Sequence, residues 1–275
     1  MKLPLRSYAN EVLTVSTLHS EYLKNYHRKL LRIRLAQWII FLSFFALWEL
    51  STSLGWLNSF IFSSPSRVVT CFLDMAKDGS IFYHIGITLM ETFISFGIVI
   101  GLGLLLAIVL WWNDSLAKIL EPYLVILNSL PKTALAPVFI VWLGNNVKTI
   151  IVAAVSVAVF GTIITIYTNF NNVEQDKIKL IYTLGGTKKH VLFKVIIPGN
   201  IPAIISTMKV NIGLSLVGVI IGEFLAASAG LGYLIIYGSQ VFKLDWVMMS
   251  IVILCIMASG LYGILNYVEK RVKQN

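Results

Sequence analysis

The chain has 275 residues, of which 57% are hydrophobic and only 13% are charged, and its mean hydropathy is +0.81. Soluble domains usually carry about 25% charged residues, so most of this chain is not suited to water. The net charge of +9 would suggest nucleic acid as a partner of a soluble protein. Basic loops on the cytoplasmic side of a membrane explain it better, and we expect no nucleic acid partner.

Six stretches are long and apolar enough to cross a bilayer, which takes about 20 residues. They cover approximately 35–54, 85–112, 116–143, 147–167, 201–226 and 246–267. The sequence therefore predicts an all-α integral membrane protein with six transmembrane helices. The first stretch starts too late and is too long for a cleavable signal peptide, so we expect it to remain as a spanning helix.

Lysine and arginine in the loops predict the orientation, because cytoplasmic loops carry the excess of both residues. With the N-terminus inside, sixteen of them fall in inner segments and only four in outer ones. We therefore expect both termini in the cytoplasm. This divides the chain into a basic tail (1–34), a first transmembrane helix (35–54), an extracytoplasmic loop with a surface helix (55–84), a membrane core (85–267) holding a cytoplasmic loop (169–200), and a second cytoplasmic tail (268–275).

The motifs of common enzymes are missing. No Walker-type phosphate loop, zinc-binding His-Glu-x-x-His helix or Gly-x-Ser-x-Gly elbow is present. The two cysteines, Cys71 and Cys255, lie far apart and predict neither a disulfide nor a metal site. We expect no catalytic residue, no metal and no cofactor in this chain.

The cytoplasmic loop of residues 169–200 is long for a simple connector. Ile178, Ile181, Tyr182 and Leu184 fit one face of a short helix, which Gly185-Gly186 should break. A second helical stretch follows and is expected to close at Pro198. Exposed apolar residues rimmed by lysines are typical of a docking surface, although a passive amphipathic loop is the alternative.

The spacing of this loop resembles the EAA loop of ABC importer permeases. In that family a glycine is followed by an Ile-x-Leu-Pro-like group at the spacing seen here between Gly185 and Val195-Ile196-Ile197-Pro198. The Glu-Ala-Ala part is absent, because Lys179, Leu180 and Ile181 occupy those positions. The resemblance assigns coupling to the ATPase to Ile178, Ile181, Tyr182, Thr183, Leu184, Gly185, Gly186, Val195, Ile197 and Pro198.

Further segments extend the resemblance over most of the chain and make it similar to the nitrate/sulfonate/taurine branch of these permeases. They are Ser64-Pro65-Ser66, the run from Leu130 to Pro137, Trp142-Leu143-Gly144, Gly222-Glu223 and the run from Gly230 to Ile235. That branch also includes importers of a thiamine pyrimidine precursor.

The resemblance implies the type I ABC importer permease fold and a defined set of partners. Two copies of the permease would form the pore as a homodimer in the lipid bilayer. Two cytoplasmic ABC ATPase subunits, which hold ATP and Mg, would each receive one coupling loop. An extracytoplasmic solute-binding protein would deliver the solute. Closure of the ATPases would pull the loops and switch the pore between its two states, which requires differential binding to those states.

Polar residues at membrane depth mark a candidate translocation path. Pro131 and Pro137 should break the third helix, and irregular backbone at that depth is tolerated only where protein or water satisfies it. We expect Asn128, Ser129, Lys132 and Thr133 to line the path, where the lysine and a half-helix N-terminus would suit an anionic solute. The alternative is that Lys132 snorkels or pairs with a carboxylate of a neighbouring helix.

Glu223 lies near the outer end of the fifth span, before a glycine-rich segment. We interpret Glu223, Gly230 and Gly232 as an outer gate in which the carboxylate accepts hydrogen bonds from loop amides. Lys209, near the inner end of the same span, is expected to snorkel. A stand-alone secondary transporter, whose cue would be inverted repeats with paired broken helices, and a non-transporting membrane scaffold are the alternatives to the ABC permease.

Overall fold

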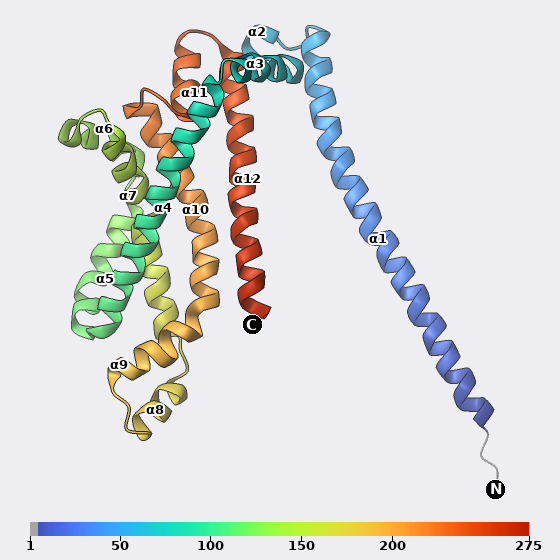
Figure 1. Ribbon diagram of the computed structural model, residues 1–275, viewed down its shortest axis with the longest axis vertical. Coiled ribbons are helices and arrows are strands. Elements are labelled where there is room, and N and C mark those ends of the chain that lie inside the picture. The colour runs from blue at the N-terminus through green and yellow to red at the C-terminus, as the bar shows by residue number, and fades with distance from the viewer. Residues whose placement is uncertain (1–4, 275) are drawn as a thin grey trace. The chain divides into compact units, whose positions relative to one another are not determined.

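The computed structural model describes residues 5–274, and within that range all the regular elements are helical (Figure 1). The chain divides into two units, residues 1–66 and 67–275, which are described separately. The helices are α1 (Leu5–Ser53), α2 (Ser59–Phe62), α3 (Pro65–Lys77), α4 (Ser80–Trp112), α5 (Asp114–Ser129), α6 (Lys132–Leu143), α7 (Val147–Asn171), α8 (Gln175–Thr183), α9 (Lys188–Val191), the π-helix η1 (Leu192–Ile196), α10 (Ile197–Ala226), α11 (Leu231–Gln240) and α12 (Leu244–Gln274).

The predicted spans match long helices of the structure. Among the described residues, five helices are long and apolar enough to cross a membrane, within α1, α4, α7, α12 and the stretch from α9 through α10. The pair α5 and α6, which is bent by 94° at the break between them, brings the number to six when it is counted as one broken span. The all-α fold with five to six candidate spans is thereby confirmed.

The first unit contains a single long helix. α1 begins at Leu5, thirty residues before the predicted span, because neither glycine nor proline interrupts the chain between Leu5 and Leu54. After α1 the chain folds back on its end: the Trp48 indole donates to the Phe62 carbonyl at 3.3 Å, and the Glu49 carboxylate accepts from the backbone amide and the hydroxyl of Ser66.

The core of the second unit is formed by α4, α7 and α10, which make the most extensive helix contacts (Figure 1). Small residues allow the close approach, as is usual for helices in membranes. A Cβ added to Gly218 would lie 2.6 Å from the Cα of Ala154, and one on Gly222 would lie 2.9 Å from the Cα of Ile150. α11 and α12 pack against each other and against α10.

The break in the third span comes at Leu130 and Pro131, as the sequence predicted. Pro131 directly precedes α6, whereas Pro137 lies inside α6 and does not break it. The second helical stretch of the loop is predicted to close at Pro198, but in the structure the helix continues through this proline. It passes into α10, because the chain changes to π-type hydrogen bonding, in which the Ile197 amide donates to the Leu192 carbonyl, just before the proline.

Candidate functional site

The turn after α8 depends on its two glycines. The Gly186 amide donates to the Ile181 carbonyl at 2.8 Å and the Gly185 amide donates to the Tyr182 carbonyl at 3.0 Å, which is the Schellman pattern of a helix end. Gly185 has φ +77°, and a Cβ on Gly186 would lie 2.7 Å from the Ile181 carbonyl oxygen. The glycine pair therefore fixes a sharp turn between α8 and α9.

The base of this loop, which we call the coupling loop (169–200), is buried. Its residues Val191, Leu192 and Ile196 form one apolar cluster with side chains of α4 and α7. Ile178 and Ile181, on the inward face of α8, pack against this cluster. The cluster consists of Ala107, Ile166, Phe170, Val191, Leu192 and Ile196. The loop is therefore attached to the membrane core by packed side chains.

Four large apolar side chains of the coupling loop are exposed. Leu184 keeps 75% of its surface accessible, and Leu180, Tyr182 and Phe193 are also exposed. We call these four residues the exposed apolar set. Among the other predicted coupling residues, Val195 and Ile197 are half-buried, Thr183 and Pro198 are exposed, and Thr183 donates to the Lys179 carbonyl. The residues predicted to form one helix face are thus divided: Ile178 and Ile181 pack against the buried cluster, whereas Tyr182 and Leu184 are exposed.

Lys188, which sequence reasoning did not select, joins the coupling loop to α4. Its Nζ donates to the Trp112 carbonyl at 2.8 Å and lies 5.3 Å from the Trp111 ring centroid. Lys188 and Trp112 are 76 residues apart in the sequence, so no local pattern indicates the contact.

The candidate path residues flank the bend between α5 and α6. Asn128 lies against α7, where a Cβ on Gly161 would be 3.2 Å from its Oδ1. The Lys132 ammonium donates to the Leu127 carbonyl and lies 5.5 Å from the Phe160 ring centroid. Ser129 donates to the Val125 carbonyl at 2.9 Å, and Asn128, Ser129 and Thr133 are exposed. Lys132 therefore contacts a backbone carbonyl and an aromatic ring.

Glu223 is the centre of a buried polar cluster at the α11 end of the core. Its side chain is only 1% exposed, and its carboxylate accepts from the Thr88 hydroxyl at 2.7 Å and from the Gly232 amide at 2.5 Å. Thr88 in turn accepts from the Leu231 amide at 2.8 Å. Orphan amides at the start of α11 are thereby satisfied. The three predicted gate residues meet here, since a Cβ on Gly230 would overlap the Glu223 carboxylate.

Two further polar residues of α4 belong to this cluster and were not selected from the sequence as site residues. His84 accepts from the Gly230 amide through Nδ1 at 3.0 Å and stacks on Tyr233 at a centroid distance of 6.1 Å. Glu91 is fully buried beside Glu223. Glu91 follows His84 by seven residues, which places both on one face of a helix. This spacing is the sequence feature that could have indicated their common cluster.

The expectation that Lys209 snorkels is wrong. Its ammonium forms an ion pair with Glu269 of α12, both side chains being largely buried, and lies 5.6 Å from the Tyr262 ring centroid. The pair joins α10 to α12, because a lysine at membrane depth is stabilised by an acidic partner.

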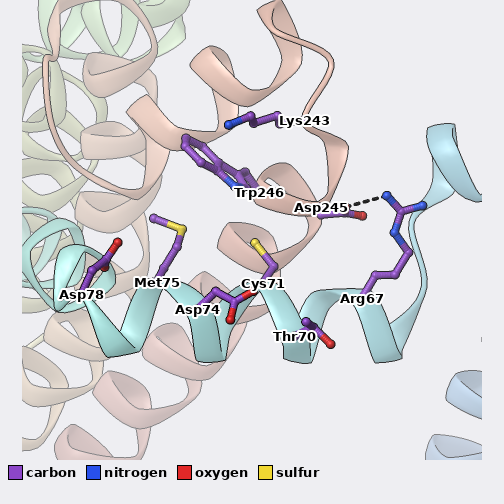
Figure 2. Close-up of a pocket in the computed structure, with 9 residues that line it drawn as sticks. All are labelled: Arg67, Thr70, Cys71, Asp74, Met75, Asp78, Lys243, Asp245 and Trp246. Carbon is purple, nitrogen blue, oxygen red and sulfur yellow. Dashed lines mark hydrogen bonds and ion pairs between the residues drawn. The ribbon is translucent and has the colours of Figure 1, made fainter.

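A cavity of about 520 Å³ opens beside α3 (Figure 2). An ion pair of 2.7 Å joins Arg67 to Asp245, and the Lys243 ammonium lies 4.3 Å from the Trp246 ring centroid. Burial, followed by the charges of Asp245 and Asp74, raises the pKa of the Cys71 thiol to about 11. The lining consists of Arg67, Thr70, Cys71, Asp74, Met75, Asp78, Lys243, Asp245 and Trp246. Within residues 5–274, no group of three acidic, histidine or cysteine side chains is placed to hold a metal ion.

The architecture of the chain defines its class. Solved transporter structures share the fold: the inward-facing MetNI methionine ABC transporter aligns with a TM-score of 0.61 and 18% identity over 70% of this chain and 95% of that chain. An amino acid ABC transporter with histidines aligns with a TM-score of 0.56 and 19% identity over 73% and 98%. The fold is that of a type I ABC importer permease.

Residues 99–274 match the family described as "Binding-protein-dependent transport system inner membrane component", and the chain belongs to this family. The formylaminopyrimidine transport permease protein ThiX of Halalkalibacterium halodurans is 28% identical over 71% of this chain and 77% of its own length. The taurine transport system permease protein TauC of Escherichia coli is 22% identical over 82% and 84%. The predicted kinship with permeases of the sulfonate and taurine type is confirmed, and the chain is a multi-pass permease subunit of the plasma membrane.

Proposed function

We propose that this permease forms the pathway by which a small solute is imported at the expense of ATP hydrolysed in a separate subunit. The solute is of the sulfonate, nitrate, taurine or thiamine-pyrimidine-precursor class and is delivered by an extracytoplasmic binding protein. Two copies of the chain form the pore, with both termini and the coupling loop in the cytoplasm. ATP and Mg belong to the partner ATPase.

The exposed apolar set carries the proposal. Leu184 lies at the tip of a loop whose base is fixed to α4 and α7 by buried side chains. A surface of this kind is costly in water and is typical of a protein interaction site. Because its base is packed, a force applied at Leu184 is transmitted to the membrane helices, whose packed interfaces do not deform continuously. Docking of an ATPase on this face therefore suits the geometry.

The bend between α5 and α6 supports the proposed path. Asn128, Ser129, Lys132 and Thr133 lie on both sides of the break, and three of them are exposed. A protonated amine there favours an anionic group of the solute. The names of ThiX and TauC specify small polar solutes for those relatives, and we extend that size class to this chain.

The test of docking is capture of the ATPase in mild detergent. Leu184→Asp adds a charge to an exposed position and should leave folding intact, while reducing the ATPase that co-purifies by about tenfold, the effect of about 1.4 kcal/mol. Gln240→Asp, also exposed but on α11, is the matched control. A wild-type chain that captures no nucleotide-binding subunit, or an L184D chain that captures as much as wild type, contradicts the proposal.

Uptake by cells expressing the complete transporter tests the path. Uptake of taurine, an alkanesulfonate, nitrate and formylaminopyrimidine is compared. We expect Lys132→Met to slow the uptake of whichever of these solutes is transported as an anion, and Lys132→Arg to retain the wild-type rate. Unchanged rate and selectivity in K132M would remove Lys132 from the path.

A further inference from the structure

Lys188 forms a directional contact between the coupling loop and α4. It is the first residue of α9, and its ammonium donates to the carbonyl of Trp112, the last residue of α4, at 2.8 Å. The same ammonium lies 5.3 Å from the Trp111 centroid and 5.9 Å from the Trp112 centroid. The last carbonyls of a helix lack partners within the helix and attract cations, and indole faces add a cation–π contribution.

The neighbouring lysine does not share this role. Lys188 is half-buried, whereas Lys189 is exposed. Trp111 itself packs against the apolar cluster at the loop base. Lys188 follows the Gly185-Gly186 turn and contacts the end of α4. The exposed Leu184 directly precedes that turn.

The opposite end of α4 is attached to α11. Thr88 contacts both the Glu223 carboxylate and the Leu231 amide, and His84 accepts from the Gly230 amide. Between these contacts and Trp112, α4 is one continuous helix. Its unbroken backbone hydrogen bonds, with a rise of about 1.5 Å per residue, make α4 a single rigid element that connects the two ends.

We propose that Lys188 is a positioning residue that couples the coupling loop to α4, so that displacement of the loop by the ATPase moves α4 and reaches the first turn of α11. The inference rests on the proposed function. It assigns to Lys188 a task different from that of the exposed apolar set: Leu184 and its neighbours bind the ATPase, and Lys188 passes the movement on.

The experiment uses the complex of the full chain with its co-purified ATPase in nanodiscs and compares Lys188→Met, Lys188→Arg and Lys189→Met. Hydrogen–deuterium exchange of peptides covering residues 228–234 is measured with and without a non-hydrolysable ATP analogue. We expect wild type, K188R and K189M to change exchange in these peptides on nucleotide binding. K188M should capture as much ATPase as wild type. Its nucleotide-dependent change in exchange over residues 228–234 should be at least threefold smaller than that of wild type.

The outcomes separate the two proposals. Failure of the wild-type chain to capture an ATPase overturns the proposed function. Normal capture with an α11 response in K188M equal to that of wild type overturns the inference alone. Loss of capture in K188M also overturns it, because Lys188 would then belong to the docking surface. If K188M does not fold, Lys188→Gln replaces it: the cation is removed while a polar side chain stays at this half-buried position, and an undiminished α11 response contradicts the proposal.

Discussion

The Thr88 hydroxyl lies between the Glu223 carboxylate and the first amide of α11, donating to Glu223 Oε1 at 2.7 Å and accepting from the Leu231 amide at 2.8 Å. One hydroxyl on α4 thus connects α10 to α11. Thr88 is fully buried, so water cannot replace either partner.

We expect Thr88→Val to destabilise the protein by about 1–3 kcal/mol, the cost of leaving buried polar groups without partners. Thr88→Ser keeps the hydroxyl and should retain most of the stability. Thermal unfolding in detergent measures the difference, and faster amide exchange at Leu231 in T88V locates it. Equal melting temperatures for T88V and T88S would show that the hydroxyl is not a structural link.

Gly230 cannot be replaced by alanine without strain. It has φ +116°, and an added Cβ would overlap the Glu223 carboxylate, which is held by Thr88 and Gly232. We expect Gly230→Ala to cost about 1–3 kcal/mol, seen as a lower melting temperature. Gly213→Ala is the control: it lies in α10 with open space around it, and it should be neutral or stabilising by up to about 1 kcal/mol. The reverse order of stability contradicts this geometry.

The Lys209–Glu269 ion pair holds α10 to α12. Removing one partner leaves the other charge in a poorly hydrated position, so Lys209→Met and Glu269→Gln should each lower the melting temperature in detergent. The exchanged pair Lys209→Glu with Glu269→Lys should recover part of the loss. Additive losses in the exchanged pair would show that the two residues do not act together.

Cys71 should react slowly with maleimides. Burial and the neighbouring carboxylates raise the pKa of its thiol from 9.0 to about 11, so the neutral thiol persists as the pH rises through the ordinary range. Because the thiolate is the nucleophile, we expect alkylation about 100-fold slower at pH 7.5 than that of an ordinary surface cysteine, with the rate still increasing tenfold per pH unit up to about pH 11.

The chain offers a clean comparison for this measurement. Cys255→Ser leaves Cys71 as the single cysteine, and adding Cys71→Ser with Lys77→Cys places an exposed thiol on the same helix. Rates followed by mass spectrometry over a pH series should differ in the pH at which they level off. If the alkylation rate of Cys71 levels off at the same pH as that of the thiol introduced by Lys77→Cys, the environment of Cys71 seen in Figure 2 is contradicted.

Asp78, another acidic residue that lines this cavity, does not complicate the measurement. Hydrogen bonds from the Ser80 hydroxyl and then from the Ser80 amide hold the pKa of its carboxyl below the ordinary value. The carboxylate of Asp78 therefore remains charged at every pH used for alkylation.

Local patterns were sufficient for much of this protein. Apolar runs of bilayer length located the spans, and Pro131 located the break between α5 and α6. The Gly185-Gly186 pair located the turn in the coupling loop, because a helix end with positive φ favours glycine wherever it occurs. These features depend on residues within a few positions of one another, and the family likeness carried by the spacing after Gly185 depends on them too.

Only the tertiary structure decided which polar residues are partners. Thr88 and Glu223 are 135 residues apart, Lys188 and Trp112 are 76 apart, and Lys209 and Glu269 are 60 apart. Each is an ordinary polar residue in its own segment, and its partner follows from how α4, α7, α10 and α12 pack. The sequence by itself determined an all-α chain with five to six candidate spans and a helical loop at residues 169–200, because hydropathy and turn chemistry are local. Helix packing decided how the loop, α4 and α11 are joined, because those contacts exist only once distant helices lie side by side.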